Sequence, residues 1–420
     1  MIDPDRFLRQ LFDVAVAAAD PMRTIPAALP PKPKGRVVVV GAGKASARMA
    51  EAVERAWGPC EGLVITRYGY ERPCQGIEII SAAHPVPDAA GQAATRRMLE
   101  LLADLGADDL VLCLISGGGS ALMVAPVAGV TLAQKQAVNA ALLASGAPIG
   151  QMNMLRKHLS RVKGGQLAAA AYPAKMLCLM ISDVPGDDPA DIASGPTVGG
   201  DRDTAQALAM VDRFAIGLPP SVRAALGQES GVVSPDDPRL SKVENRIISA
   251  PGQSLAAAAE IAKSQGIETR LLGDDLEGEA RELASAQIAL AVEIQAAMKA
   301  DDPPVLLLSG GECTVTRRGD GVGGPNAEFA LAAALALQGT RGIDVLSCDT
   351  DGVDGGAEVA GAIANAHTMM RALARGIDPK SALANNDAHG FFGTIGGQIV
   401  TGPTLTNVND FRAILIKGKG

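Results

Sequence analysis

Short apolar runs alternate with helix-length segments along almost the whole chain of 420 residues, and this alternation limits the fold more than any other feature. Strands that are buried on both faces read as continuous runs of Val, Ile and Leu, and parallel strands need a connection long enough to hold a helix. The pattern therefore predicts an α/β protein with largely parallel strands. A chain of this length also exceeds one ordinary hydrophobic core, so two domains are expected.

The predicted elements form two series, separated by a proline-rich segment at residues 218–243 that is typical of a linker or an excursion at a sheet edge. We place the domain boundary inside it, which gives domains of residues 1–235 and 236–420. The expected strands are residues 37–40, 63–66, 77–81, 110–115 and 176–181, then 247–250, 269–272, 305–308, 313–316, 343–347, 398–401 and 413–416. The expected helices are residues 45–57, 89–105, 132–143, 254–265, 278–300 and 327–337.

Composition and charge exclude several classes of protein. The net charge of −8 argues against non-specific nucleic-acid binding, which needs a basic surface. The sequence contains no run of about 18 apolar residues, so we expect no membrane-spanning helix. The acidic start of the chain lacks the pattern of a signal peptide. The six cysteines show no CxxC spacing, which fits a reducing compartment and not a structural zinc site. We therefore expect a cytoplasmic protein that binds neither nucleic acid nor membranes.

A glycine turn with a lysine follows the first predicted strand. Gly41, Gly43 and Lys44 lead from this strand into a helix, whose first N–H groups attract anions. The turn lacks the spacing of a Walker A loop, and Ser46 stands where a dinucleotide fingerprint has its third glycine. An ordinary strand-to-helix turn remains the alternative. The charge of Lys44 favours a site for an anion.

A second turn, Ser116-Gly117-Gly118-Gly119-Ser120, follows another predicted strand. Three consecutive glycines cost chain entropy, and a structural role alone is hard to assign to them. Backbone N–H groups together with two serine hydroxyls suit a phosphate or a carboxylate. The turn is therefore predicted to bind an anion.

A basic cluster and an acidic loop lie close together in the sequence. Residues 156–163 contain four cations, and on a helix Arg156 and Lys163 would share one face, where an anion would relieve their repulsion. A solvated basic face is the alternative, and His158 is expected to be an ordinary polar or packing residue. Asp187 and Asp191 follow the predicted strand 176–181, where one or two acids could hold Mg²⁺ together with substrate phosphates. A capped acidic turn is the alternative there.

Polar residues gather in the glycine-rich loops of the second half at residues 309–312, 323–328, 347–356, 385–387 and 401–410. The acids at alternate positions in 349–354 are faintly like the start of an EF-hand. However, Gly352 comes too early and the closing glutamate is missing, which excludes a calcium loop. Together the clusters exceed what turns require, so they are candidates for a binding site.

Six of these segments point to a known family. GAGKA at residues 41–45, ISGGGSAL, RKHLSRVKGG, SDVPGDDPADIASGPT, TDG at residues 350–352 and TGPTLTNVND resemble, in the same order, the motifs of class II glycerate 2-kinases, whose C-terminal domain is called MOFRL. The resemblance implies an N-terminal Rossmann-like parallel-sheet domain, a C-terminal mixed-sheet α/β domain and an active site between them. It also implies ATP, Mg²⁺ and phosphorylation of the 2-hydroxyl of D-glycerate. The assembly stays open, with a homodimer as one candidate.

By motif, Lys44, Asp351 and Asn407 match the active-site positions proposed for that family. In the mechanism we expect, Lys44 contacts the transferred phosphoryl group, Asp351 is the general base, and Asn407 and Asn409 orient polar groups. Arg156 and Lys157 are expected to bind the substrate carboxylate or phosphates. The nucleotide is expected at the turns that contain Gly41, Gly43 and residues 116–120, together with Glu312 and Asn326. Asp187 and Asp191 are expected to hold Mg²⁺.

One departure from the family concerns a cation. Many relatives read Gly-Gly-Arg-Asn-Gln-Glu where this chain has Pro325 before Asn326, so an arginine expected at phosphate is absent. Arg156 and Lys157 are the candidates to replace it. Two other functions remain open: a hydroxypyruvate reductase using NAD(P)H, against which the incomplete fingerprint at Gly41 argues, and a sensor of sugar acids or nucleotides without catalytic activity.

Overall fold

The computed structural model describes residues 3–419, and the chain divides into two compact units. The N-unit is Pro21–Ile248, and the C-unit combines Met1–Asp20 with Ser249–Gly420. The chain therefore passes from one unit to the other twice, after Asp20 and after Ile248. Each unit is described by itself below.

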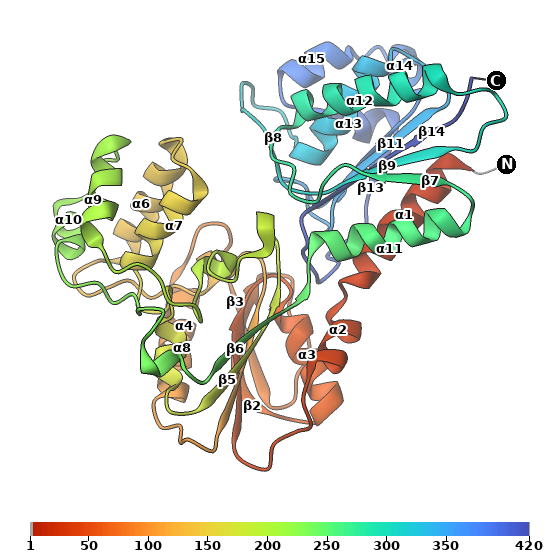
Figure 1. Ribbon diagram of the computed structural model, residues 1–420. Coiled ribbons are helices and arrows are strands. Elements are labelled where there is room, and N and C mark those ends of the chain that lie inside the picture. Colours follow the sequence, from red (N-terminus) through yellow and green to blue (C-terminus); the bar gives the residue numbers. More distant parts are fainter. Residues whose placement is uncertain (1–2, 420) are drawn as a thin grey trace. The chain divides into compact units, whose positions relative to one another are not determined.

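A six-stranded sheet forms the centre of the N-unit (Figure 1). The strand order is β3-β2-β1-β4-β5-β6, and β1 pairs in parallel with β2 and β4, β2 with β3, and β4 with β5. The predicted parallel sheet is thereby confirmed. Doubly wound α/β sheets with this strand order bind ligands at the carboxyl ends of the strands, at the point where the order reverses. The strands are β1 (Val37–Ala42), β2 (Glu61–Arg67), β3 (Ile77–Ala82), β4 (Leu110–Ile115), β5 (Lys175–Ile181) and β6 (Val243–Ser249).

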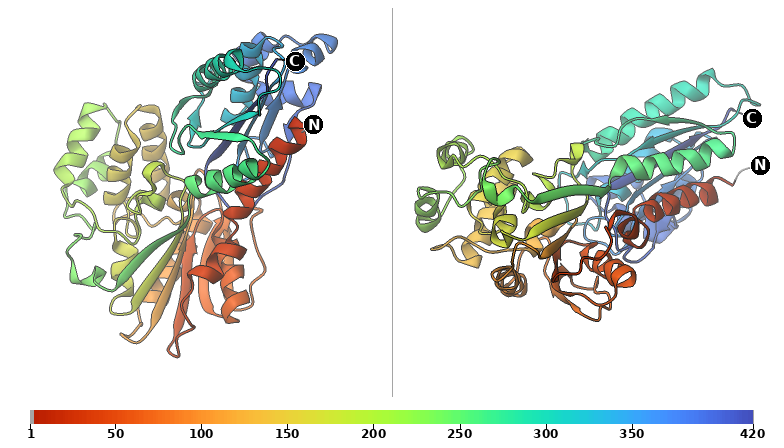
Figure 2. Two further views of the ribbon diagram at one scale, coloured as in Figure 1. Left: turned by 45° about the vertical axis from the view of Figure 1, so that its right-hand side comes forward. Right: turned by 60° about the horizontal axis from the view of Figure 1, so that its bottom comes forward.

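Helices cover both faces of this sheet (Figures 1 and 2). α2 (Pro21–Ala28) and α3 (Ser46–Trp57) lie on one face, and α4 (Ala89–Leu102) and α8 (Gln166–Ala171) on the other. Every residue of β1 is buried, as its unbroken apolar run predicts. The sheet is therefore a rigid layer from which the turns at its strand ends project.

Four further helices form a separate cluster at one end of the N-unit (Figure 1). They are α6 (Leu132–Ala144), α7 (Ile149–His158), α9 (Thr204–Arg213) and α10 (Pro220–Leu226), and they enclose a core of their own that includes Val138, Leu142, Leu155, Met210 and Val222. The segment 218–243, predicted as a linker or an edge excursion, contains α10 and leads into the edge strand β6.

The C-unit contains a mixed six-stranded sheet, which confirms the prediction for this half of the chain. Its order is β13-β12-β11-β14-β9-β7; only the β7–β9 pair among these is parallel. The sequence did not predict β12, which is short and contains only Gly, Ala and Ile. The strands are β7 (Glu268–Leu271), β9 (Val305–Ser309), β11 (Ile343–Asp349), β12 (Gly361–Ala364), β13 (Gln398–Ile399) and β14 (Asp410–Ile416), beside a small pair of β8 (Gly278–Glu279) and β10 (Cys313–Thr314).

Alternate residues of these strands face two helical layers. Leu306 and Leu308 of β9 pack with α1 (Pro4–Ala18) and α11 (Pro251–Ser264), whereas Val305 and Leu307 pack with α12 (Ala280–Ala297) and α13 (Pro325–Leu337). Figure 1 shows the two pairs of helices on opposite sides of the sheet. The first helix of the chain thus completes the C-unit. The remaining helices are α5 (Gly119–Leu122), α14 (Thr368–Ala374), α15 (Pro379–Ala384) and α16 (Ala388–Ile395), with 3₁₀ turns at Pro185–Asp187, Ile192–Ser194 and Pro238–Leu240.

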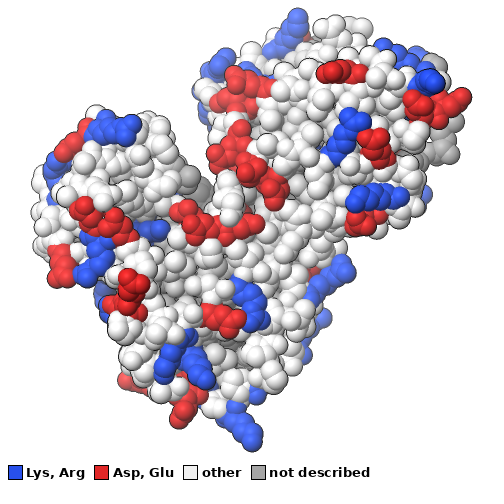
Figure 3. Space-filling view, viewed as in Figure 1, with Lys and Arg blue, Asp and Glu red and all other residues white. Residues whose placement is uncertain are grey.

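On the face shown in Figure 3, basic and acidic side chains are interspersed over the surface of each unit. Within residues 3–419, every helix is too short or too polar to cross a lipid bilayer.

Candidate active site

The two glycine turns of the N-unit form one structure at the point where the strand order reverses. The Lys44 N–H donates to the carbonyl of Gly117 at 2.8 Å, and the Ala45 N–H donates to Ser116 Oγ at 3.0 Å. Ser46 Oγ donates to the Leu114 carbonyl at 3.0 Å. The turn after β1 and the turn after β4 are therefore held together by direct hydrogen bonds.

Close packing of these turns explains several of their glycines. A Cβ on Gly41 would lie 2.1 Å from the Leu114 oxygen, one on Gly43 would lie 2.0 Å from Ser116 Oγ, and one on Gly119 would lie 2.7 Å from the Ala42 oxygen. Close packing against the turn after β1 thus gives Gly119 a structural role, which was hard to assign from the sequence. The buried Ser116 hydroxyl also has a structural role, because it contacts the turn after β1.

We predict that Gly41→Ala destabilises the protein by at least about 3 kcal/mol, because the added methyl group meets backbone and not a movable side chain. Gly150→Ala is the control: Gly150 is an exposed position in α7 with no atom near an added Cβ, and alanine favours a helix. Chemical denaturation of both variants measures the difference. Equal stability of the two variants would contradict the packing explanation.

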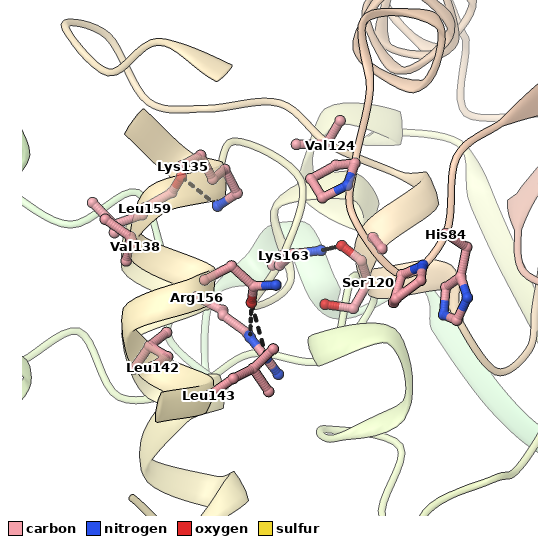
Figure 4. Close-up of a pocket in the computed structure, with 15 residues that line it drawn as sticks. His84, Ser120, Val124, Lys135, Val138, Leu142, Leu143, Arg156, Leu159 and Lys163 are labelled. Atoms are coloured by element: carbon pink, nitrogen blue, oxygen red, sulfur yellow. Dashed lines mark hydrogen bonds between the residues drawn. The ribbon is translucent and has the colours of Figure 1, made fainter. Parts of the chain in front are cut away.

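A cavity of about 210 Å³ lies beside Gly118 (Figure 4). Gly118 has a φ of 81°, and a Cβ there would lie 3.0 Å from His84 Cδ2 and 3.3 Å from Lys44 Cγ. Lys44 and His84 therefore both border Gly118. The cavity is lined by His84, Pro85, Pro87, Gly118, Ser120, Ala121, Val124, Lys135, Val138, Asn139, Leu142, Leu143, Arg156, Leu159 and Lys163.

Three cations of this lining lie close together. Lys163 Nζ donates to the carbonyls of Ser120 at 2.7 Å and Met123 at 3.4 Å, and Lys135 Nζ donates to the Leu159 carbonyl at 3.0 Å (Figure 4). Arg156 donates to Asn139 Oδ1 from Nε at 3.2 Å and from Nη2 at 3.0 Å. Burial and the neighbouring Arg156 lower the pKa of Lys135 to about 8. Burial, with Lys135 and Arg156 nearby, lowers the pKa of Lys163 well below its usual value.

The basic cluster is not one helix, contrary to the face-sharing expected for Arg156 and Lys163. α7 ends at His158, and Lys163 reaches the same cavity from the loop that follows. Lys157 is half-buried and lies outside the cavity lining. His158 Nδ1 lies 2.7 Å from Ser230 Oγ, and burial lowers the pKa of its ring.

The acidic loop is linked to this cavity by hydrogen bonds. Asp191 Oδ1 accepts from Asn153 Nδ2 at 3.1 Å, and Asn153 Oδ1 accepts from Arg156 Nη1 at 3.2 Å. The buried Oδ1 atom of Asp187 has no hydrogen-bond partner among the described residues. Within that part of the chain, no group of three or more His, Cys, Asp and Glu side chains could hold a metal ion alone. An arrangement with one or two carboxylates is the kind that Mg²⁺ uses together with phosphates and water.

In the C-unit, Asn326 belongs to a buried network. Its Nδ2 donates to Asp410 Oδ1 at 2.6 Å, and its Oδ1 accepts from Ser347 Oγ at 2.6 Å. Asp354 accepts from the Asn326 and Ala327 N–H groups at the start of α13, and its Oδ2 lies 3.0 Å from His389 Nε2. Both ends of the Asn326 amide are thus used inside the protein. Its nucleotide-binding role stays a prediction.

Two loops of the C-unit bring the expected Asp351 and Asn407 into buried positions. Asp351 Oδ1 accepts from the Val353 N–H at 2.8 Å, and the Thr404 N–H donates to the Asp351 carbonyl at 3.1 Å. Asn407 Oδ1 accepts from the Asn409 N–H at 3.3 Å. The buried Nδ2 of Asn409 has no hydrogen-bond partner within residues 3–419. These two loops therefore hold buried polar side chains, and the Asn409 amide is a donor without a partner among the described residues.

Glu312 is exposed at the end of the SGGE turn. A buried arginine, Arg412, holds this turn: it donates to Ser309 Oγ at 3.3 Å and to the Gly310 carbonyl, and it pairs with Asp410 at 2.9 Å. Burial is the largest influence on Asp410 and raises the pKa of its carboxyl, while Arg412 opposes that rise. The role predicted for Glu312 stays a prediction.

Sequence reasoning missed three polar residues of the cavity, namely His84, Lys135 and Asn139. Lys135 lies three residues before Val138 and seven before Leu142, which puts it on the apolar face of α6. A lysine on the buried face of a helix is unusual, and this was the available signal. His84 and Asn139 carry no comparable signal in the sequence.

Two family models match the chain: a domain of unknown function, DUF4147, over residues 7–227, and the MOFRL family over residues 305–410. A protein of Agrobacterium vitis with the provisional name hydroxypyruvate reductase is 49% identical over 415 residues, which are 97% of this chain and 94% of that protein. The D-glycerate 2-kinase of Thermotoga maritima is 38% identical over 416 residues, 98% of each chain. A crystal structure of glycerate kinase from Thermotoga maritima superposes with a TM-score of 0.87 over 98% of this chain and 99% of that one, at 38% identity.

These matches confirm that the chain is an enzyme of the kinase class. It belongs to the class II glycerate 2-kinase (MOFRL) family, as its motifs predict. The predicted boundary between residues 235 and 236 stays a prediction, because it falls between the two family matches.

Proposed function

We propose that this chain transfers the γ-phosphoryl group of ATP to the 2-hydroxyl of D-glycerate, giving 2-phosphoglycerate and ADP. A bond forms between the hydroxyl oxygen and the γ-phosphorus while the bond from that phosphorus to the β–γ bridging oxygen breaks, and the hydroxyl proton passes to a base. The observation that carries the proposal is the full-length similarity to a protein named D-glycerate 2-kinase. Lys44 at the end of β1 and the three cations of the adjacent cavity support it.

Phosphoryl transfer depends on positioning and on neutralising charge more than on covalent chemistry by the protein. In the proposal, Lys44 contacts the oxygens of the transferred group from the joined glycine turns. Gly118 and Ser120 border the adjacent cavity and offer backbone and hydroxyl groups to phosphate. Asn407 orients polar groups of the substrates, and Asp351 accepts the hydroxyl proton.

Asp187 and Asp191 are proposed to hold Mg²⁺. The unpartnered buried oxygen of Asp187 supports this assignment, because a buried carboxylate oxygen without a donor is costly and a cation would satisfy it. When bound, the ion would neutralise charge on the phosphates. Asp191 is already oriented by Asn153, which places it near the cations of the cavity.

The test is phosphorus NMR of the full chain with ATP and D-glycerate, with and without Mg²⁺. We expect ADP and a new phosphomonoester signal coupled to the proton on C2 of glycerate, in the Mg²⁺ sample only. A signal coupled to the C3 protons would move the transfer to the other hydroxyl. Tight binding of both substrates without any product would favour the non-catalytic sensor and contradict the proposal.

The second candidate is a hydroxypyruvate reductase, because the Agrobacterium vitis relative carries that provisional name. One observation argues against the reductase. The third glycine of a dinucleotide turn lets the helix pack closely on the strand because it has no side chain, but this chain has Ser46 there, and the Ser46 hydroxyl donates to the neighbouring strand. Incubation with hydroxypyruvate and NADH or NADPH distinguishes the two. Loss of the 340 nm absorbance, on the order of one turnover per second or faster, would support the reductase.

A further inference from the structure

The cavity of the N-unit presents an electrostatic problem. Lys135 and Lys163 are buried, with only 1% of Lys163 exposed, and Arg156 lies beside them. None of the described residues on the cavity lining is Asp or Glu. The hydrogen bonds given above join these cations to carbonyl and amide oxygens, which are neutral acceptors. Buried charges are costly unless they are paired with an opposite charge.

One wall of the cavity is largely aliphatic, and it is the wall that also carries Lys135 and Arg156. Val124, Val138, Leu142, Leu143 and Leu159 line it, and Figure 4 shows several of these side chains on the two helices that also carry Lys135 and Arg156. A lining that combines three cations with branched hydrocarbon side chains fits a small amphipathic anion. It fits a fully hydrated phosphate chain poorly, since the aliphatic wall offers no hydrogen bonds.

The volume of the cavity distinguishes a small acid from a nucleotide as its ligand. The cavity measures about 210 Å³, whereas sites for ligands as large as a nucleotide usually measure about 300–1,000 Å³. Lys44 also borders Gly118, since its Cγ lies 3.3 Å from the position of a Cβ there, and the phosphates of ATP are proposed to bind at Lys44 and the joined glycine turns. The cavity is thus next to the reacting phosphate and is too small for the nucleotide.

We infer that this cavity binds the acceptor acid, with its carboxylate among Lys135, Arg156 and Lys163 and its carbon chain along the aliphatic wall. Short 2-hydroxy acids with an apolar substituent at C2 therefore belong to the substrate class together with glycerate. The identity of the acid as the acceptor rests on the proposed function. Binding of the acid does not require turnover, so it can be measured by itself.

Isothermal titration calorimetry of the full chain without ATP tests the inference. D-Glycerate and D-lactate are expected to bind with affinities within about tenfold of each other, because they differ by one hydroxyl at the aliphatic wall. Glycerol, which has no carboxylate, is expected not to bind. Inorganic phosphate is the other anion in the test. Phosphate that binds more tightly than both acids would assign the cavity to a phosphoryl group and overturn the inference.

Arg156→Gln is the main variant, and Arg161→Gln is its control because Arg161 is an exposed cation in the same segment. The loss of a charged hydrogen bond is expected to weaken both acids about 10- to 100-fold in Arg156→Gln and to leave the control unchanged. Leu143→Trp is a second variant that narrows the cavity from a side chain that is 64% exposed, so its folding is not at risk. Normal binding of both acids in either variant would overturn the inference.

The affinity should also depend on pH. An anion requires the protonated form of Lys135, whose pKa is about 8, so the affinity for acid is highest below pH 8 and falls as the pH rises through that value. Lys163 changes it in the same direction, because its pKa is lowered too; Arg156 stays charged, and His84 is the remaining ionisable group on the lining. Affinity that rises between pH 7 and 9 would contradict the inference.

The two proposals fail in different ways. Acids that bind as described but give no phosphorylated product would overturn the kinase proposal and leave the acid pocket standing. Product formation with an unchanged KM for glycerate in Arg156→Gln would overturn the pocket and leave the kinase standing.

Discussion

Lys44→Ala is expected to lower kcat for phosphorylation of D-glycerate by about a thousandfold or more, the loss found when a cation on a transferred phosphoryl group is removed. Lys44 lies in the turn whose N–H donates to Gly117, and its side chain borders Gly118. The hydrogen bonds of the turn use backbone atoms and serine side chains, so the variant should keep its fold.

Initial rates at saturating ATP and glycerate measure this effect. Lys175→Ala is the matched control, because Lys175 is an exposed lysine at the opposite end of the same sheet, where β5 begins. Unchanged melting temperatures for both variants would show that folding is not the cause. Near-normal turnover of a folded Lys44→Ala protein would remove the proposed role of Lys44.

Asp351→Asn is expected to reduce kcat by about 10²- to 10⁴-fold, the usual contribution of a general base. An asparagine side chain keeps the size of Asp351 and can still accept from the Val353 N–H, but it cannot take up the hydroxyl proton. The KM for ATP should change little, because the proposed role concerns the acceptor.

The control for this variant is Asp320→Asn, an exposed aspartate in another loop of the C-unit. Rapid-quench measurement of the first turnover separates the chemical step from product release. A loss confined to product release, with a normal first turnover, would contradict the role of Asp351 as base.

The positions of most strands along the chain could be predicted from the sequence, because buried strands such as β1 and β4 are continuous apolar runs rich in Val or Leu. Short or small-residue strands could not. The β12 strand reads Gly-Ala-Ile-Ala, which carries neither a β-branched run nor alternation, and it becomes a strand because its neighbours β11 and β13 pair with it. Sequence patterns likewise could not show that α1 packs in the C-unit.

The parts of the candidate site that consist of residues adjacent in the sequence could be predicted. The glycine turns and Lys44 come from adjacent residues, and the structure brings the two turns together. The cavity was not predictable, because it combines a loop residue after β3, a buried lysine on α6 and a lysine beyond the end of α7. Such a set depends on tertiary packing. Asn326 shows the reverse case, since a polar residue in a glycine-rich loop is also what a buried hydrogen-bond network requires.

The place of α1 in the C-unit has a consequence for synthesis of the chain. Phe7, Leu8, Leu11 and Phe12 are synthesised well before the sheet that covers them, which is built from residues after Ser249. At ordinary elongation rates this apolar face waits on the order of tens of seconds for its partner. A nascent chain stopped before the residues after Ser249 are synthesised would expose the apolar face of α1, and exposed apolar helices are typical targets for chaperones. A fragment beginning at Ser249 would lack the same helix and should need it supplied as a separate peptide to fold.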